Sequence, residues 1–87
     1  MEQHLSVAQA ASEVIQHACE NFSTTSRQDE LCGEILAALT IAARVDIQAR
    51  ERHAFVSRWQ SLLPEVLRAN GRAVFAVIVE QKLEELL

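Results

Sequence analysis

Three side chains that could ligate a metal ion occur at helical spacing near the start of the chain. Glu13, His17 and Glu20 are separated by four and three residues, so a helix would place them on one side. Metal sites in helical bundles use a Glu-x-x-His spacing that points into the core. This set has one more residue between Glu13 and His17, and it lies opposite the apolar positions of its own segment. We therefore interpret it as a solvated polar face and expect no metal or other cofactor.

Residue types used in nucleophilic catalysis and phosphate binding are present, but their spacing does not match those chemistries. Cys19 and Cys32 form no Cys-x-x-Cys motif, and two glycines are too few for a phosphate-binding loop. No Ser or Cys stands in a nucleophile elbow. The sequence thus predicts a protein that is not an enzyme. We expect two buried free thiols, with a disulfide as the less favoured alternative.

A basic and aromatic stretch in the second half is the strongest candidate for a binding surface. Tryptophan and arginine dominate the energetics of many protein interfaces. We hypothesise that the apolar side chains of this stretch are buried against another protein, while its arginines set the orientation against an acidic surface. A core role for the tryptophan is the simpler alternative, because an apolar helical stripe must also pack within the chain. The predicted partner-binding residues are Arg50, Arg52, Phe55, Arg58, Trp59, Leu62 and Leu63.

Charge is unevenly distributed in a chain whose net charge is -4 at pH 7. Most basic residues lie between Arg44 and Arg72, whereas acidic residues predominate in 1–40 and after Arg72. Such a basic block with a tryptophan could contact phosphates and stack a base, so a helical nucleic-acid-binding regulator is the alternative function. The acidic overall balance argues against nucleic acid as a partner. The alternation of charge favours contacts between the blocks, within one chain or between antiparallel copies.

Apolar residues at three- and four-residue intervals, beginning with Leu5, predict a first helix from about Ser6 to Phe22. The polar stretch 23–26 interrupts this pattern, and its hydroxyl groups can cap a following helix. Thr25 and Gln28 have the spacing of a capping box for a second helix that begins near Arg27.

This second helix meets no Gly or Pro between Gly33 and Pro64. A continuous helix of that length would be about three times the usual length of ~11–12 residues. We therefore prefer a break or kink near 44–47, with Asp46 capping the next helix, over one unbroken helix. Pro64 is expected in the first turn of a further helix, which predicts a corner at 62–65.

The stretch 73–79 is rich in β-branched residues and could form a buried strand or a helix. A strand would need a partner strand, and Val79, Leu83 and Leu86 continue at helical spacing beyond the stretch. We predict a helix that lies near the centre of the assembly, with Asn70-Gly71 as a cap or a tolerated defect.

The stretch Ile35–Ala43 is apolar around the whole circumference of the predicted helix. Such a helix must be covered on every side, and an 87-residue chain that forms one domain has only a thin core. The sequence therefore predicts an all-α bundle of three to five helices, completed by homodimerisation. We expect an interaction protein that acts as an adaptor, chaperone, inhibitor or anti-activator. With no leader and no apolar run near the ~20 residues of a membrane span, we expect it to be cytoplasmic.

Overall fold

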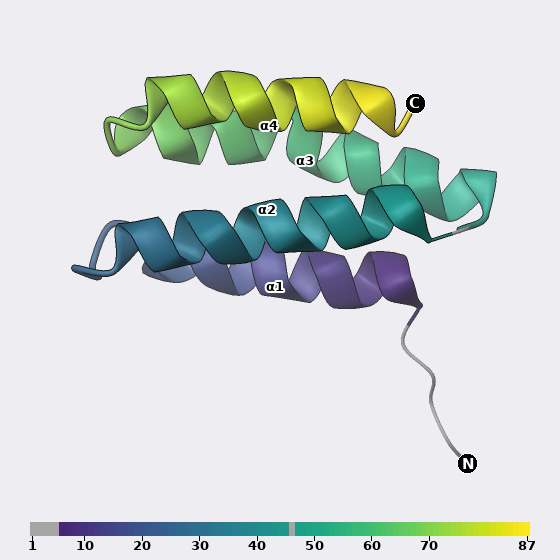
Figure 1. The fold of residues 1–87 in the computed structure, drawn as a ribbon, viewed down its shortest axis with the longest axis horizontal. Helices are drawn as coiled ribbons and strands as arrows, with labels where there is room; N and C mark the ends of the chain where they lie inside the picture. Colours follow the sequence, from purple (N-terminus) through teal and green to yellow (C-terminus); the bar gives the residue numbers. More distant parts are fainter. Residues whose placement is uncertain (1–5, 46) are drawn as a thin grey trace, which may run out of the picture.

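The computed structural model describes residues 6–45 and 47–87, which form four α-helices (Figure 1). The all-α bundle predicted from the sequence is confirmed. The break between the second and third helices and the helical conformation of 73–79 are confirmed as well, whereas the predicted capping role of Asp46 and the place of Leu5 lie outside the described residues. The helices are α1 (Val7–Asn21), α2 (Gln28–Arg44), α3 (Ala49–Ala69) and α4 (Ala73–Glu85).

α1 begins with a capping box. The Ser6 hydroxyl accepts a hydrogen bond from the Gln9 N–H, and the Gln9 side-chain oxygen accepts one from the Ser6 N–H, each at 3.1 Å. The capping box predicted for α2 is wrong. Thr25 Oγ1 instead accepts from the N–H of Arg27 at 3.0 Å. The Gln28 amide donates to the Phe22 carbonyl at 2.8 Å, so it satisfies the end of α1 rather than the start of α2.

The corner predicted at Pro64 is also wrong, because α3 continues through this residue to Ala69. A proline inside a helix removes one backbone hydrogen bond and crowds the preceding turn. Here the core stripe runs across it without interruption, since Trp59, Leu63 and Leu67 are all buried and Pro64 is buried beside them. Burial of this stripe outweighs the local cost of the proline.

α3 ends where Gly71 adopts a φ of 76°, a left-handed conformation that favours glycine. The Arg72 N–H donates to the Leu67 carbonyl at 2.8 Å, and the Gly71 N–H donates to the Arg68 carbonyl at 3.1 Å. This pair of bonds is a Schellman motif, which satisfies carbonyl groups at the end of α3 and reverses the chain into α4. The prediction that Asn70-Gly71 acts as a helix cap is confirmed.

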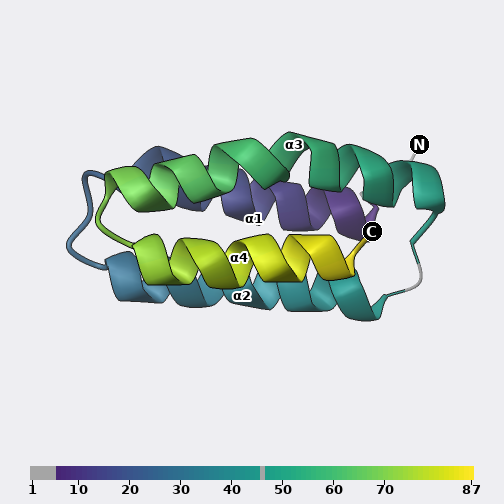
Figure 2. The same cartoon turned by 90° about the horizontal axis from the view of Figure 1, so that it is seen from above.

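The four helices form two antiparallel hairpins, α1 with α2 and α3 with α4. The hairpins are stacked so that α3 lies over α1 and α4 lies over α2 (Figures 1 and 2). The chain passes from α2 to α3 between helices that lie diagonally across the bundle.

The core lies between the two hairpins, and every helix contributes one apolar stripe to it. α1 and α2 contribute many alanines, and α3 contributes the bulkiest side chain, Trp59, which is 1% exposed. The largest fully buried side chains are Trp59, Phe22, Ile15, Ile35, Leu39, Leu63, Leu67, Leu83, Val56, Val79 and Pro64.

All four helices carry large apolar residues outside this core, and the most exposed of these helical residues are on α2 and α4. Ile41 on the outer side of α2 is 52% exposed, and Val74, Val77 and Ile78 are exposed on α4. Within the single chain 73–79 is not central, because a bundle of two stacked hairpins has no central helix, and its place in an assembly stays a prediction. Each helix buries one stripe and exposes the rest of its circumference.

The adjacent residues Leu62 and Leu63 offer a matched test of this core, because Leu63 is 0% exposed and Leu62 is 47% exposed. We expect Leu63→Ala to lower the free energy of unfolding by about 2–5 kcal/mol, since it leaves a cavity between the hairpins. Leu62→Ala should change it by less than about 1 kcal/mol. Urea denaturation followed by circular dichroism measures both. Equal losses would contradict the assignment of Leu63 to the core and Leu62 to the surface.

The two glycines are predicted to respond in opposite directions to alanine. Nothing lies within 4 Å of a Cβ atom added at Gly33, which sits inside α2. We therefore expect Gly33→Ala to stabilise the protein by about 0.5–1 kcal/mol. Gly71→Ala should destabilise it by about 1–2 kcal/mol, because alanine is strained at positive φ. Thermal unfolding at a low, fixed concentration checks both signs, and a stabilising Gly71→Ala would contradict the Schellman turn.

Candidate protein-interaction surfaces

The structure divides the predicted partner-binding residues between the core and the surface. Phe55, Trp59 and Leu63 are buried within the bundle, so in this conformation they pack against the chain itself. This outcome matches the alternative that the tryptophan belongs to the core. The remaining apolar member, Leu62, is on the surface.

The arginines of the predicted surface do not share one face. Arg50 and Arg58 are exposed on the outer side of α3, whereas Arg52 is half-buried and follows Arg50 by two residues, or roughly 200° around the helix. Arg58 and Leu62 are one turn apart and lie on neighbouring positions. The exposed part of the predicted surface is therefore the side of α3 that carries Arg50, Arg58 and Leu62, which we call the α3 edge.

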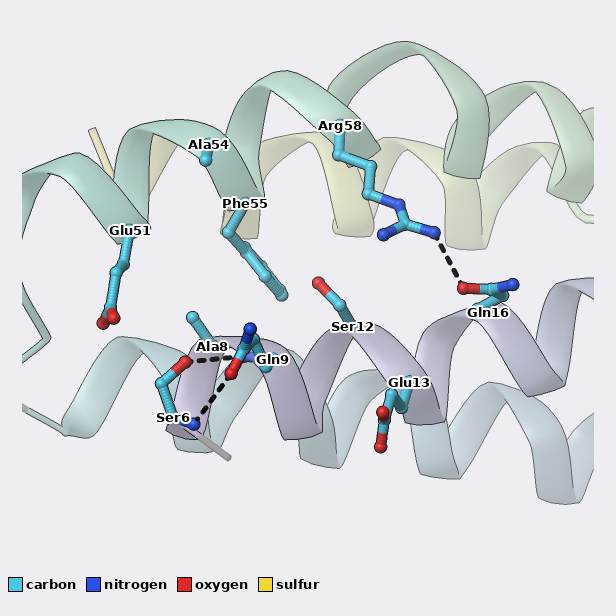
Figure 3. A pocket seen from close by; sticks show the side chains of 10 residues that line it. All are labelled: Ser6, Ala8, Gln9, Ser12, Glu13, Gln16, Glu51, Ala54, Phe55 and Arg58. Carbon is cyan, nitrogen blue, oxygen red and sulfur yellow. Dashed lines mark hydrogen bonds between the residues drawn. The ribbon is translucent and has the colours of Figure 1, made fainter. Parts of the chain in front are cut away.

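Arg58 connects the α3 edge to a groove between α1 and α3 (Figure 3). Its guanidinium donates to the side-chain oxygen of Gln16 across the groove at 2.7 Å, and its Cζ lies 4.9 Å from the centroid of the Trp59 ring. The ring stabilises the cation by about 0.5–1 kcal/mol. Arg58 is thus held in place by a neutral acceptor and an aromatic face.

The groove has a volume of about 450 Å³, and its two ends differ in charge. Phe55 extends into it from α3, between Ala8 of α1 and Ala54 of α3 (Figure 3). Glu51 lies toward the end opposite Arg58 (Figure 3). Most of the lining residues are polar, and Glu13 lies toward the same end as Arg58 (Figure 3). A segment bound here would therefore meet Arg58 and Glu13 at one end and Glu51 at the other.

Trp59 reaches α1 through its indole nitrogen. The Nε1–H donates to the Ser12 hydroxyl at 3.0 Å, so the one polar group of this buried side chain is satisfied. Ser12 also lines the groove. The hydrogen bond that holds α3 against α1 therefore involves a residue that lines the groove.

Two arginines of the basic stretch between Arg44 and Arg72 form ion pairs within the chain. Arg72 Nη1 lies 2.8 Å from Asp29 Oδ1, and Arg68 pairs with Glu80. Both pairs join the basic middle of the chain to its acidic parts, and each stabilises the fold by only about 0–1 kcal/mol because it is exposed. The arginines left for a partner are spread over α2 and α3, which does not favour one continuous phosphate-binding surface.

A second groove, not predicted from the sequence, lies between α1 and α2 on the side away from the other hairpin, and its volume is about 760 Å³. Its lining is mostly apolar, with Val14 41% exposed and Ile41 52% exposed. Glu13, His17 and Glu34 also line it. The sequence feature that could have indicated this groove is Val14, an apolar residue on the otherwise polar side of α1.

The remaining reactive side chains are dispersed. Among the described residues, no three His, Cys, Asp or Glu side chains are close enough to hold a metal ion. His17 lies beside Asn21, which donates to the His17 carbonyl. Cys19 and Cys32 are free, half-buried thiols. Burial raises the pKa of both thiols; Glu20 adds to the effect at Cys19, and Arg72 opposes it at Cys32.

None of the described helices combines the length and the apolar composition that crossing a bilayer requires. Comparison with known proteins finds no match to a family model, to a curated protein or to a solved structure.

The bond between Ser12 and Trp59 can be tested against a second serine. Ser12→Ala leaves the indole N–H without its partner in a partly buried position, so we expect the free energy of unfolding to fall by about 1–2 kcal/mol. Ser57→Ala, on the exposed side of α3, should change it by less than about 0.5 kcal/mol. Urea denaturation followed by Trp59 fluorescence measures both. A neutral Ser12→Ala would contradict a structural role for this bond.

Proposed function

We propose that the protein is an interaction module that binds another protein through the α1–α3 groove and the α3 edge. The observation that supports this proposal is Arg58 at one end of the α1–α3 groove. Its guanidinium lies over an aromatic ring and has a neutral side chain as its only hydrogen-bond acceptor among the described residues. An arginine beside an aromatic ring is typical of the residues that dominate binding energy once a partner covers them.

The chemistry of the groove indicates what the partner presents. An apolar side chain would pack against Ala54, the exposed apolar residue of the lining, while a carboxylate would replace Gln16 as the acceptor for Arg58. A charge-assisted bond of this kind is roughly twice as strong as one to a neutral amide. The partner segment is therefore apolar with an acidic group at one end, and Glu51 favours a basic group at the other.

Binding of such a segment would let the protein act as an adaptor, chaperone, inhibitor or anti-activator. In each case the same step occurs: an exposed segment of the partner is covered, and it is then withheld from, or presented to, something else. The groove needs no rearrangement of the core to accept the segment, because Phe55 and Trp59 are already held by the bundle.

The test is capture of proteins from the native source on immobilised wild-type protein and on three variants, followed by titration with the purified partner. We expect a partner that is retained by the wild type and by Glu84→Gln, an exposed control on α4. Arg58→Glu and Leu62→Asp should weaken its binding at least about 10-fold, because they place negative charge where the partner is acidic or apolar.

Circular dichroism of each variant separates loss of binding from loss of fold. A purified partner that binds wild type, Arg58→Glu and Leu62→Asp with equal affinity would contradict the α3 edge as the binding surface. Tight binding of a basic partner with strong salt dependence would contradict the proposed acidic chemistry.

A further inference from the structure

The outer side of the α1–α2 hairpin, which we call the α1–α2 face, carries a groove that is larger and more apolar than the α1–α3 groove. Val14 and Ile41 project there with about half of their surface exposed, and Ala10 and Ala37 line the same groove. Exposed apolar side chains gathered in one groove typically mark an interaction site. The occupant must match both this apolar middle and the charges at its ends.

Those charges follow a symmetric pattern along α2. Glu30, Ala37 and Arg44 are each seven residues apart, or two helical turns, so they form one row on the α1–α2 face. Glu30 and Arg44 are both exposed and stand about 21 Å apart, with Ala37 midway between them. The single ion pair of Glu30 among the described residues is a 3.6 Å contact with Arg27 in which both side chains are largely exposed. The face is therefore acidic at one end and basic at the other, and its middle combines Val14, Ala37 and Ile41 with the carboxylates of Glu13 and Glu34.

We propose that the α1–α2 face binds a second copy of this chain in an antiparallel, two-fold symmetric dimer. A two-fold axis that passes beside Ala37 brings Glu30 of each copy opposite Arg44 of the other. The same operation brings α1 against α1 near Val14, which lines the groove together with Ala37. Ile41 of each copy then packs beside Ala37 and the aliphatic stem of Glu34 of the other.

Self-complementarity distinguishes this occupant from other proteins. A basic amphipathic helix would match Glu30, Glu34 and Glu13 but would meet Arg44, and an acidic helix would meet all three carboxylates. Packing of the α1–α2 face on the exposed α4 residues of another copy would be heterologous and would leave both surfaces open for further copies. The two-fold arrangement pairs Glu30 of each copy with Arg44 of the other and closes on itself.

The size of the face determines how tight the dimer is. α2 has 17 residues and is about 25 Å long, and two helices side by side are about 20 Å wide. The contact would bury roughly 1,000 Å² in total, which is at the low end for specific interfaces. We therefore expect a dimer that dissociates on dilution.

Sedimentation velocity over a dilution series tests the proposal with charge reversals. Wild-type protein should shift from monomer toward dimer as its concentration rises. Arg44→Glu and Glu30→Arg should each weaken the dimer at least about 10-fold, because each places like charges opposite one another twice. An equimolar mixture of the two variants should dimerise as the wild type does, since both charge pairs are complementary in the mixed dimer. The double variant should also dimerise.

Glu65→Arg, an exposed charge reversal on α3, is the matched control and should leave dimerisation unchanged. All of these substitutions are on exposed helical positions, and circular dichroism checks that each variant stays folded. Wild-type protein that remains monomeric at every concentration would overturn the proposal. So would a dimer that resists both single reversals, or variants that fail to associate when mixed.

Discussion

Burial of the α3 stripe between the two hairpins is the interaction on which the rest of the structure depends. Each hairpin alone is a two-helix unit with an exposed apolar side, and helices this short are marginal in water without tertiary packing. Trp59, Leu63 and Leu67 fill the space between the hairpins. The Trp59 indole also donates to Ser12 on α1, which adds a directional contact to the apolar packing. The α1–α3 groove exists because this packing holds α1 and α3 side by side.

The stacked arrangement also explains why apolar surface remains uncovered. In two stacked hairpins each helix packs against two neighbours, so about half of its circumference faces outward (Figure 2). Ile35, Leu39 and Ala42 occupy the inner side of α2, but Ala37 and Ile41 on the same helix are exposed in the part of the chain that the structure describes. The proposed dimer would cover the α1–α2 face and leave the α3 edge accessible, so a dimer would present two α3 edges. Two linked sites of this kind increase avidity when their spacing suits a partner with two segments.

Local sequence patterns were enough to predict the helical conformation, the break near 44–47 and the turn at Gly71, because these features depend on a few neighbouring residues. They failed at Pro64, where long-range burial of Leu63 and Leu67 overrides a local helix-start signal. They also did not separate the predicted binding residues into buried and exposed ones. Trp59 and Leu62 are both apolar residues of one helix, and the packing of α3 against its neighbouring helices decides which of them is buried. The α1–α2 groove was missed for the same reason, since it forms only when side chains of two separate helices, such as Val14 of α1 and Ile41 of α2, come together.

The most direct test of this account is the concentration dependence of the amide spectrum of isotopically labelled protein. A dimer on the α1–α2 face predicts shift changes at Ala10, Val14, Ala37 and Ile41 as the protein is concentrated, with the exposed residues of α4 unchanged. Shifts that cluster at Val74, Val77 and Ile78, or a spectrum that does not change with concentration, would contradict it.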